Sequence, residues 1–288
     1  MINEENIMLY ICATPIGNLN DITLRGLEIL KTADIILCED TRNSARLLHH
    51  HGIDSKKLVA LHDHNENEVS TRVIEWLEQG LTLVQISDAG TPGISDPGAR
   101  LCNMAFEHGF MPRPLPGACA YISLLSVSGL VDIPSLFFGF LPSKSTQRCK
   151  QMETWRDVDY AVVIYESPHR ICECIDDIIS TLGADRVLVV GRELTKQFET
   201  IVKMTAQEYR EFLHADSNQQ RGEFVINILP LDSSANDSEQ LTAEQLKIVN
   251  LLASELPTKK AVNLTAKICG GNKDLLYNYL LAQKDNKQ

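Results

Sequence analysis

The chain has 288 residues, of which 44% are hydrophobic and 23% charged, and its formal net charge is −11. This composition excludes a disordered or collagen-like chain, and the length suits about two domains of ~150 residues each. No apolar run approaches the ~18 residues of a membrane helix, and the acidic N-terminus lacks the basic region of a secretory signal. We therefore expect a soluble, cytoplasmic protein.

Strands and helices alternate in the first half of the chain. Strands are expected at residues 8–13, 34–38, 57–62, 81–86 and 110–115. Helices are expected at 21–33 and 41–51, from the capping-box pair Asn65 and Glu68 onward, and at 99–108. Continuously apolar strands that alternate with helices predict a parallel sheet covered on both faces.

The second half has a different pattern. A helix is expected at 118–128, and strands at 136–140, 160–165, 187–191, 197–203 and 223–229. Only one short helix joins the last two strands, which favours a mixed sheet. The predicted fold class is α/β: two α/β domains, with a mostly parallel N-terminal sheet and a mixed second sheet, plus a small C-terminal helical extension.

The domain boundaries follow from these patterns. We expect an N-terminal α/β domain at 1–117, a second α/β domain at 118–231, a polar linker at 232–240 and a helical extension at 241–288.

The extension differs from the rest of the chain in its charge. Residues 242–288 contain seven Lys and four acidic residues, a net charge of +3. The rest of the chain therefore carries a net charge of −14. Its helices are expected at 242–255, 258–268 and 273–283. Short helices with lysines at their starts and a Gly270-Gly271 break resemble a helix-turn-helix that contacts an anionic partner. A helical cap that only packs against the protein is an equally open interpretation.

The eight cysteines show no CxxC pair and no matching histidine spacing. Neither a disulfide framework nor a zinc site is predicted, and we expect the cysteines to be buried small apolar side chains.

Four turns rich in Gly and Pro follow predicted strands at their carboxyl ends. They lie at residues 14–18, 87–93, 116–120 and 166–170. In open parallel sheets, ligands bind in the crevice beyond the strand carboxyl ends. The chain contains neither G-x-G-x-x-G nor a Walker P-loop, so neither a dinucleotide nor a phosphate cradle is indicated. The turns predict one crevice for another kind of ligand.

The acidic and histidine side chains near this edge leave their roles open. Asp88 is placed either to accept hydrogen bonds from a ribose or an ammonium group, or to cap its turn. Asp88 and Asp96 together could hold Mg²⁺. This indication is weak, because magnesium sites of this kind usually take carboxylates from several strand ends, and these two follow the same strand. His62 and His64 point to opposite faces of an extended segment, and no metal site is predicted.

The motifs of the chain resemble those of the RsmI-type ribosomal RNA small-subunit methyltransferases, which belong to the tetrapyrrole methylase (class III) superfamily. The matching segments are LYI at 9–11, TPIGNL at 14–19, DIT at 21–23, EDTR at 39–42, LHDHNE at 61–66, SDAGTP at 87–92, SDPG at 95–98, PLPG at 114–117, GFLP at 139–142, YESPHR at 165–170, RELTK at 192–196 and GE at 222–223. One departure is Ala118, where relatives often carry Pro.

The resemblance implies transfer of a methyl group from S-adenosylmethionine to the ribose 2′-oxygen of a cytidine in the decoding region of 16S rRNA. It also implies a homodimer, the small ribosomal subunit as partner, and the cofactor in a cleft between two α/β domains. The cofactor-binding residues would be Ala13, Thr14, Pro15, Ser87, Asp88, Ala89, Gly90, Thr91, Pro92, Gly117, Ala118, Cys119, Tyr165, Glu166 and Ser167.

The chemistry of this reaction needs no metal, because the methyl group is already activated on a sulfonium. A ribose hydroxyl is a poor nucleophile until its proton is drawn off, so a general base is expected. The candidate bases are Asp40, His64 and Glu66. The candidate RNA-binding residues are Arg42, Arg170, Lys196, Lys259 and Lys260. Two rival hypotheses are a small-molecule tetrapyrrole methyltransferase and a non-enzymatic RNA-binding assembly factor.

Overall fold

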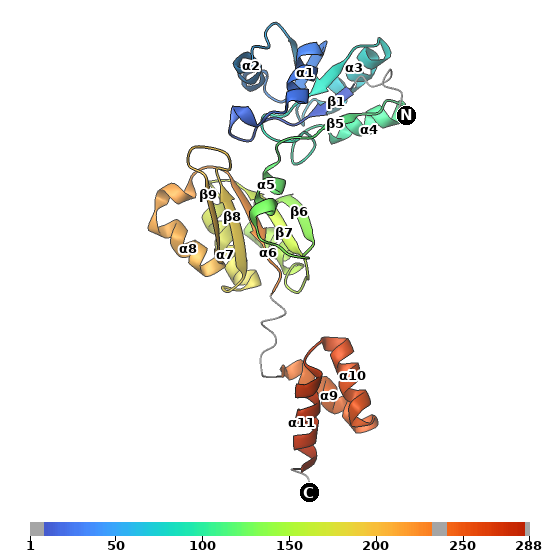
Figure 1. Ribbon diagram of the computed structural model, residues 1–288, viewed down its shortest axis with the longest axis vertical. Helices are drawn as coiled ribbons and strands as arrows, with labels where there is room; N and C mark the ends of the chain where they lie inside the picture. Colours follow the sequence, from blue (N-terminus) through green and yellow to red (C-terminus); the bar gives the residue numbers. More distant parts are fainter. Residues whose placement is uncertain (1–8, 232–240, 286–288) are drawn as a thin grey trace. The chain divides into compact units, whose positions relative to one another are not determined.

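The computed structural model describes residues 9–231 and 241–285. The chain divides into two compact units, Met1–Pro230 and Leu231–Gln288 (Figure 1). The predicted linker at 232–240 lies outside the described residues. Among the described residues, no helix is long and apolar enough to span a bilayer.

The N-terminal part of the first unit is built on a parallel sheet. Its strands are β1 (Leu9–Cys12), β2 (Ile35–Cys38), β3 (Lys57–Ala60), β4 (Leu83–Gln85) and β5 (Arg113–Leu115). They are ordered β3-β2-β4-β1-β5, and every pairing is parallel. The turns after β1 and β4 are therefore neighbours at the carboxyl edge of the sheet, although they lie more than 70 residues apart in the sequence.

Helices cover both faces of this sheet, as predicted. Those on one face are α1 (Leu24–Thr32) and α2 (Thr41–His50), which contribute Leu30 and Leu48 to an apolar cluster. Those on the other are α3 (Glu66–Glu78) and α4 (Ala99–Glu107), which contribute Val73 and Leu101 (Figure 1). Strand β2 is buried along its whole length, which explains its uninterrupted apolar sequence.

The second sheet is mixed, which confirms the prediction. Its strands are β6 (Ser135–Phe140), β7 (Ala161–Glu166), β8 (Val187–Arg192), β9 (Thr200–Thr205) and β10 (Phe224–Ile228). In the order β6-β7-β10-β8-β9, only β6 and β7 pair in parallel.

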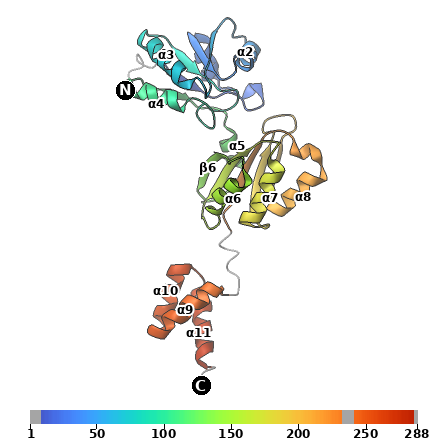
Figure 2. The same cartoon turned by 180° about the vertical axis from the view of Figure 1, so that it is seen from behind.

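Helices also lie on both faces of the second sheet. The helices on one face are α6 (Ser145–Glu153), α7 (Ile171–Leu182) and α8 (Ala206–Ala215) (Figure 2). Helix α5 (Ala120–Val127) packs on the opposite face through Leu124. Helices α6 and α7 were not predicted from the sequence.

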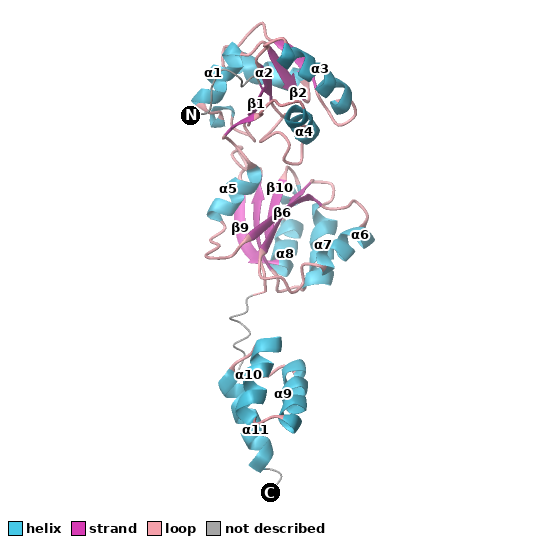
Figure 3. Ribbon diagram, turned by 90° about the vertical axis from the view of Figure 1, so that its right-hand side faces the viewer, coloured by secondary structure: helices cyan, strands magenta, loops and turns pink. Residues whose placement is uncertain are grey.

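The C-terminal unit is helical over its described residues (Figure 3). Its helices are α9 (Ala243–Glu255), α10 (Thr258–Cys269) and α11 (Lys273–Asp285), close to the predicted ranges. They enclose an apolar core of their own, which includes Val249, Ala261 and Leu276. Gly270 and Gly271 both have positive φ, a conformation that suits glycine and separates α10 from α11.

Two smaller predictions need correction. Helix α3 begins at Glu66 without a side-chain cap. The Asn65 side chain instead accepts a hydrogen bond from the His62 N–H at 2.8 Å and donates one to the Ala60 carbonyl at 3.0 Å.

The eight cysteines are all free, but only Cys12, Cys38 and Cys174 are buried, and the other five are partly exposed.

Candidate active site

Backbone and hydroxyl hydrogen bonds tie together the turns that follow β1, β4 and β5. Thr14 and Gly90 exchange backbone hydrogen bonds of 2.8 and 2.9 Å. The buried Thr14 hydroxyl donates to the Ser87 carbonyl at 2.9 Å, and the Thr91 hydroxyl donates to the Ala118 carbonyl at 3.0 Å. These turns therefore form one connected framework at the carboxyl edge of the parallel sheet.

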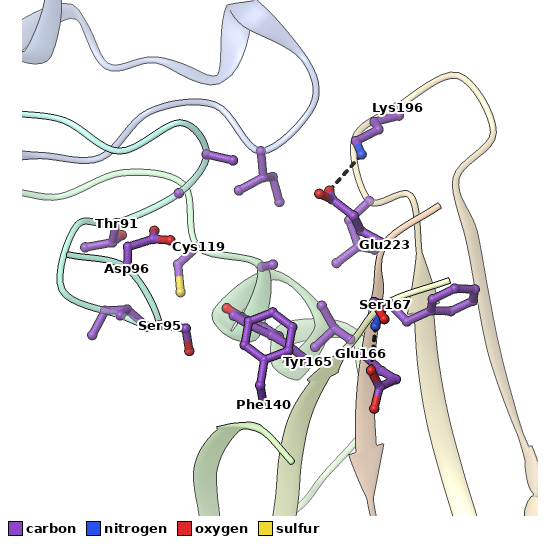
Figure 4. A pocket seen from close by; sticks show the side chains of 18 of the residues that line it. Thr91, Ser95, Asp96, Cys119, Phe140, Tyr165, Glu166, Ser167, Lys196 and Glu223 are labelled. Carbon is purple, nitrogen blue, oxygen red and sulfur yellow. Dashed lines mark hydrogen bonds and ion pairs between the residues drawn. The ribbon is translucent and has the colours of Figure 1, made fainter. Parts of the chain in front are cut away.

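A cavity of about 320 Å³ lies between this framework and the carboxyl end of β7. Figure 4 shows Asp96, Thr91 and Ser95 on the side of the N-terminal sheet, and Lys196 and Glu223 across from them. All four predicted turns contribute to the lining. The predicted cofactor residues that line it are Ala89, Gly90, Thr91, Cys119, Tyr165, Glu166 and Ser167.

The other predicted cofactor residues do not line this cavity. Those buried within the turns are Ala13, Thr14, Ser87 and Pro92. Gly117 fits against Ala13, since a Cβ on Gly117 would lie 2.8 Å from the Ala13 Cβ.

Pro15 and Asp88 instead line a second hollow, of about 400 Å³. Its other polar lining residues are Asn43, Arg46, His49 and His50. The Asn43 amide donates to Asp88 Oδ2 at 2.8 Å, so this carboxylate oxygen already accepts a hydrogen bond from a neighbouring side chain.

Several lining residues were not in the predicted cofactor-binding set, among them Ile16, Phe140, Leu194 and Asp96. Phe140 reaches the cavity because β6 is irregular between Phe137 and Gly139, and its ring centroid lies 5.7 Å from that of Tyr165. The GFLP motif at 139–142 and the SDPG motif at 95–98 were the available sequence signals. Burial raises the pKa of the Tyr165 hydroxyl, which accepts a hydrogen bond from the Tyr121 N–H at 3.1 Å.

The three predicted bases lie outside the lining of the cavity. Asp40 caps α2 and accepts hydrogen bonds from the Arg42 guanidinium at 2.6 and 3.1 Å. These hydrogen bonds lower the pKa of Asp40 to about 2, which makes it a weak base at neutral pH. His64 is exposed in the turn after β3.

Glu66 is buried and serves the start of α4. One of its carboxylate oxygens accepts backbone N–H groups from Gly98, Arg100 and Leu101 at 2.9, 3.1 and 3.3 Å. A negative group at a helix N-terminus satisfies donors that have no partner within the helix and complements the helix dipole. We therefore propose that Glu66 is a structural anchor, in place of the catalytic role predicted for it.

Two of the predicted RNA-binding cations are bound to carboxylates of the protein. The Arg170 guanidinium contacts Glu166 at 2.7 Å, and Lys196 contacts both Glu193 and Glu223 at 2.8 Å. Hydrogen bonds from Lys196 in turn favour the ionised form of Glu193, although burial opposes them, and the net effect lowers the pKa of Glu193. Their charges are thus largely matched within the protein.

The remaining predicted cations face solvent. Arg42 is exposed beside Asp40, and Lys259 and Lys260 are exposed at the start of α10. Within the described part of the chain, no group of three or more His, Cys, Asp or Glu side chains is placed to hold a metal ion.

Known protein families match the sequence along most of its length. Residues 8–209 match the family model for tetrapyrrole (corrin/porphyrin) methylases, and residues 239–284 match that of the RsmI C-terminal helix-turn-helix domain. The ribosomal RNA small subunit methyltransferase I of Haemophilus influenzae is 45% identical over 96% of both chains. The chain belongs to the ribosomal RNA small subunit methyltransferase I family. The family member from Pseudomonas aeruginosa is 42% identical over 96% of this chain and 97% of its own.

Solved structures support the fold assignment. The methyltransferase CobJ aligns with a TM-score of 0.58 and 16% identity, over 78% of this chain and 95% of that one. A diphthine synthase aligns with a TM-score of 0.57 and 16% identity, over 77% of this chain and 89% of that one. At this identity the likeness concerns the fold alone, and the tetrapyrrole methylase fold predicted for the two α/β domains is confirmed. The family makes the chain a methyltransferase.

Proposed function

We propose that this methyltransferase uses S-adenosylmethionine to methylate the ribose 2′-oxygen of a cytidine in the decoding region of 16S rRNA. The observation that carries the proposal is the cavity formed by all four turns, in a chain 45% identical to a small subunit rRNA methyltransferase. It acts on the small ribosomal subunit or its free rRNA, in the cytoplasm where that subunit is assembled.

The chemistry of the cavity suits a sulfonium cofactor. Its volume falls within the ~300–1,000 Å³ of small-molecule sites. The rings of Phe140 and Tyr165 line it, and aromatic faces attract a cation. Gly90, with φ of +84°, lets the backbone of the turn after β4 border the cavity without a side chain.

When bound, S-adenosylmethionine supplies a methyl group that is already activated for transfer. The residues of the chain then have to align the acceptor oxygen, exclude water and accept a proton. The hydrogen bonds between Thr14 and Gly90 and between Thr91 and Ala118 hold the cavity wall in one arrangement. Such alignment contributes up to ~7–11 kcal/mol in well-oriented reactions. Apolar side chains such as Leu194 and Val225 exclude water from the wall.

RNA contact is proposed to involve the C-terminal unit. Lys259 and Lys260 are exposed at the start of α10, in a segment that matches a helix-turn-helix model. Arg42 is an exposed candidate in the first unit. Arg170 and Lys196 are less suited to phosphate, because each already contacts a carboxylate.

A homodimer is proposed from the exposed apolar side chains of α5, β6 and the segment between them. Exposed apolar side chains and an edge strand with unpaired backbone groups both favour association, and β6 is such a strand. The side chains concerned are Ile122, Val127, Val131, Ile133, Leu136 and Phe138. Sedimentation equilibrium should give twice the chain mass of 32.2 kDa. A monomer at micromolar concentration would contradict the dimer.

The function is tested with small subunits and free 16S rRNA from a strain that lacks the corresponding gene. The purified chain should transfer a radiolabelled methyl group to one of them, and mapping should place it on a cytidine 2′-oxygen. Cys119→Trp, which fills the cavity, should abolish transfer, whereas the matched Cys119→Ser should retain it. Label on a tetrapyrrole acceptor alone supports a small-molecule methyltransferase, and cofactor binding without any transfer supports an assembly factor.

A further inference from the structure

Three carboxylates line the cavity, and their surroundings differ. Glu166 contacts the Arg170 guanidinium at 2.7 Å, and Glu223 contacts Lys196 at 2.8 Å. Within the described part of the chain, Asp96 forms no ion pair with a basic side chain. Asp96 is therefore the lining carboxylate whose charge a cation does not neutralise, and a carboxylate without such a neighbour has a higher proton affinity than an ion-paired one.

Buried polar groups hold the loop that carries Asp96. The Gln85 amide, at the end of β4, donates to the Pro97 carbonyl at 2.7 Å. Glu66 accepts the N–H groups of Gly98 and Leu101 immediately after it. Buried polar groups are unfavourable unless they are hydrogen-bonded, so this arrangement strongly constrains the loop.

The backbone around Asp96 is also specialised. Ser95 has φ of +64°, which is uncommon for a residue with a side chain, and such strain concentrates at functional sites. Gly98 has φ of +133°, and a Cβ on it would overlap the Gln85 amide. The chain thus tolerates a strained turn to place this aspartate in the wall of the cavity.

We propose that Asp96 is the catalytic base, and that Glu66 and Gln85 are positioning residues that hold its loop. This inference rests on the proposed function. In the step, the ribose oxygen forms a bond to the methyl carbon while the carbon–sulfur bond breaks. The hydroxyl proton passes to the Asp96 carboxylate, and the sulfonium becomes a neutral thioether.

The electrostatic surroundings of Asp96 suit this role. Burial, reinforced by the charge of Glu39, raises the pKa of Asp96 to about 7. The other groups that act on it are the carboxylates of Asp88 and Asp63, which raise the pKa, and the side chain of Ser87, which lowers it. Asp96 in turn contributes to the raised pKa of Tyr165 across the cavity. A base with a pKa near the working pH combines a useful ionised fraction with proton affinity.

The decisive variant is Asp96→Asn, which keeps the shape of the side chain and removes the titrating group. We expect kcat to fall by about 10²–10⁴-fold. S-adenosylmethionine binding, measured by calorimetry, should stay within about threefold. In the wild type, kcat should fall about tenfold per pH unit below pH 7, and the residual activity of Asp96→Asn should lack this decline.

Asp63→Asn is the matched control, because it removes an exposed carboxylate outside the lining of the cavity. This variant should retain kcat, and its decline in kcat should be displaced toward lower pH, because Asp63 contributes to the raised pKa of Asp96.

A stability measurement tests the role without activity. Because the pKa of Asp96 is higher in the folded chain than in the unfolded one, the wild type loses stability as pH rises from about 4 to 7. Asp96→Asn should therefore melt at a higher temperature than the wild type at pH 8, and the difference should shrink toward pH 4.

The outcomes separate the two proposals. Wild-type kcat in Asp96→Asn, or an unchanged pH decline in that variant, overturns the base assignment while leaving the proposed function intact. Loss of cofactor binding in Asp96→Asn also overturns it, because the aspartate would then bind the cofactor. Absence of rRNA methylation by the wild-type chain refutes the proposed function, and the base assignment with it.

Discussion

Replacing Glu66 by alanine removes the acceptor that holds the start of α4. In the folded chain a single carboxylate oxygen accepts the N–H groups of Gly98, Arg100 and Leu101. The variant distinguishes a structural anchor from a catalytic base, because an anchor is required for stability and a base is required only for turnover.

The loss of stability expected for Glu66→Ala follows from the backbone N–H groups that lose their acceptor. Gly98 and Leu101 are buried, so their N–H groups would remain without an acceptor, whereas Arg100 is exposed and its N–H can reach water. Each buried unpaired donor costs about 1–3 kcal/mol, and the lost charge at the helix N-terminus adds ~0.3–1 kcal/mol. We expect Glu66→Ala to lower the free energy of unfolding by about 2–7 kcal/mol. Glu66→Gln keeps an oxygen acceptor, so it should lose about 1–2 kcal/mol.

Urea unfolding followed by circular dichroism measures this loss. The matched control is Glu68→Ala, which removes an exposed carboxylate from the same first turn of α3 and should change stability by less than ~0.5 kcal/mol. A wild-type unfolding midpoint for Glu66→Ala refutes the anchor assignment. Wild-type stability of Glu66→Gln together with abolished methyl transfer would restore Glu66 as a candidate base.

Three further variants test other parts of the structure. Arg148→Ala should destabilise the chain by about 3 kcal/mol in urea unfolding, because it leaves Asp177 without its buried partner at 2.6 Å; an unchanged midpoint contradicts this. Asp40→Asn should leave kcat and its decline below pH 7 unchanged, since a group with a pKa of about 2 stays ionised there; a shifted pH profile would show otherwise. The double variant Lys259→Ala, Lys260→Ala should weaken RNA binding and reduce the slope of log K against log salt concentration by about 1–2 in filter-binding assays, and an unaltered slope removes both lysines from the RNA interface.

Local sequence patterns were sufficient for most of the architecture. The apolar run at 34–38 became β2, and the helical pattern at 99–108 became α4, each within two residues. The parallel and mixed character of the two sheets also followed from the sequence, because it depends on whether strands alternate with helices. Helices α6 and α7 were the exceptions, because neither was predicted.

The candidate site was predictable in its location and less so in its side chains. The turns at 87–93 and 116–120 could be placed at the carboxyl edge of a sheet, since strand direction fixes which ends meet. Lys196, which is predicted to bind RNA, pairs with Glu223, and this partner lies 27 residues away in the sequence.

The sequence by itself determined the elements, their order and the edge where the turns gather, because the spacing of apolar side chains and the positions of Gly and Pro act over a few residues. Only the tertiary structure decided that Asp96, and not Glu66, lines the cavity. Glu66 and Asp96 both follow strands of one sheet, yet Glu66 turns inward to backbone donors 32 to 35 residues away, and Asp96 is left in the wall. The role of a polar side chain depends on its burial and its hydrogen-bond partners, and distant segments of the chain supply both.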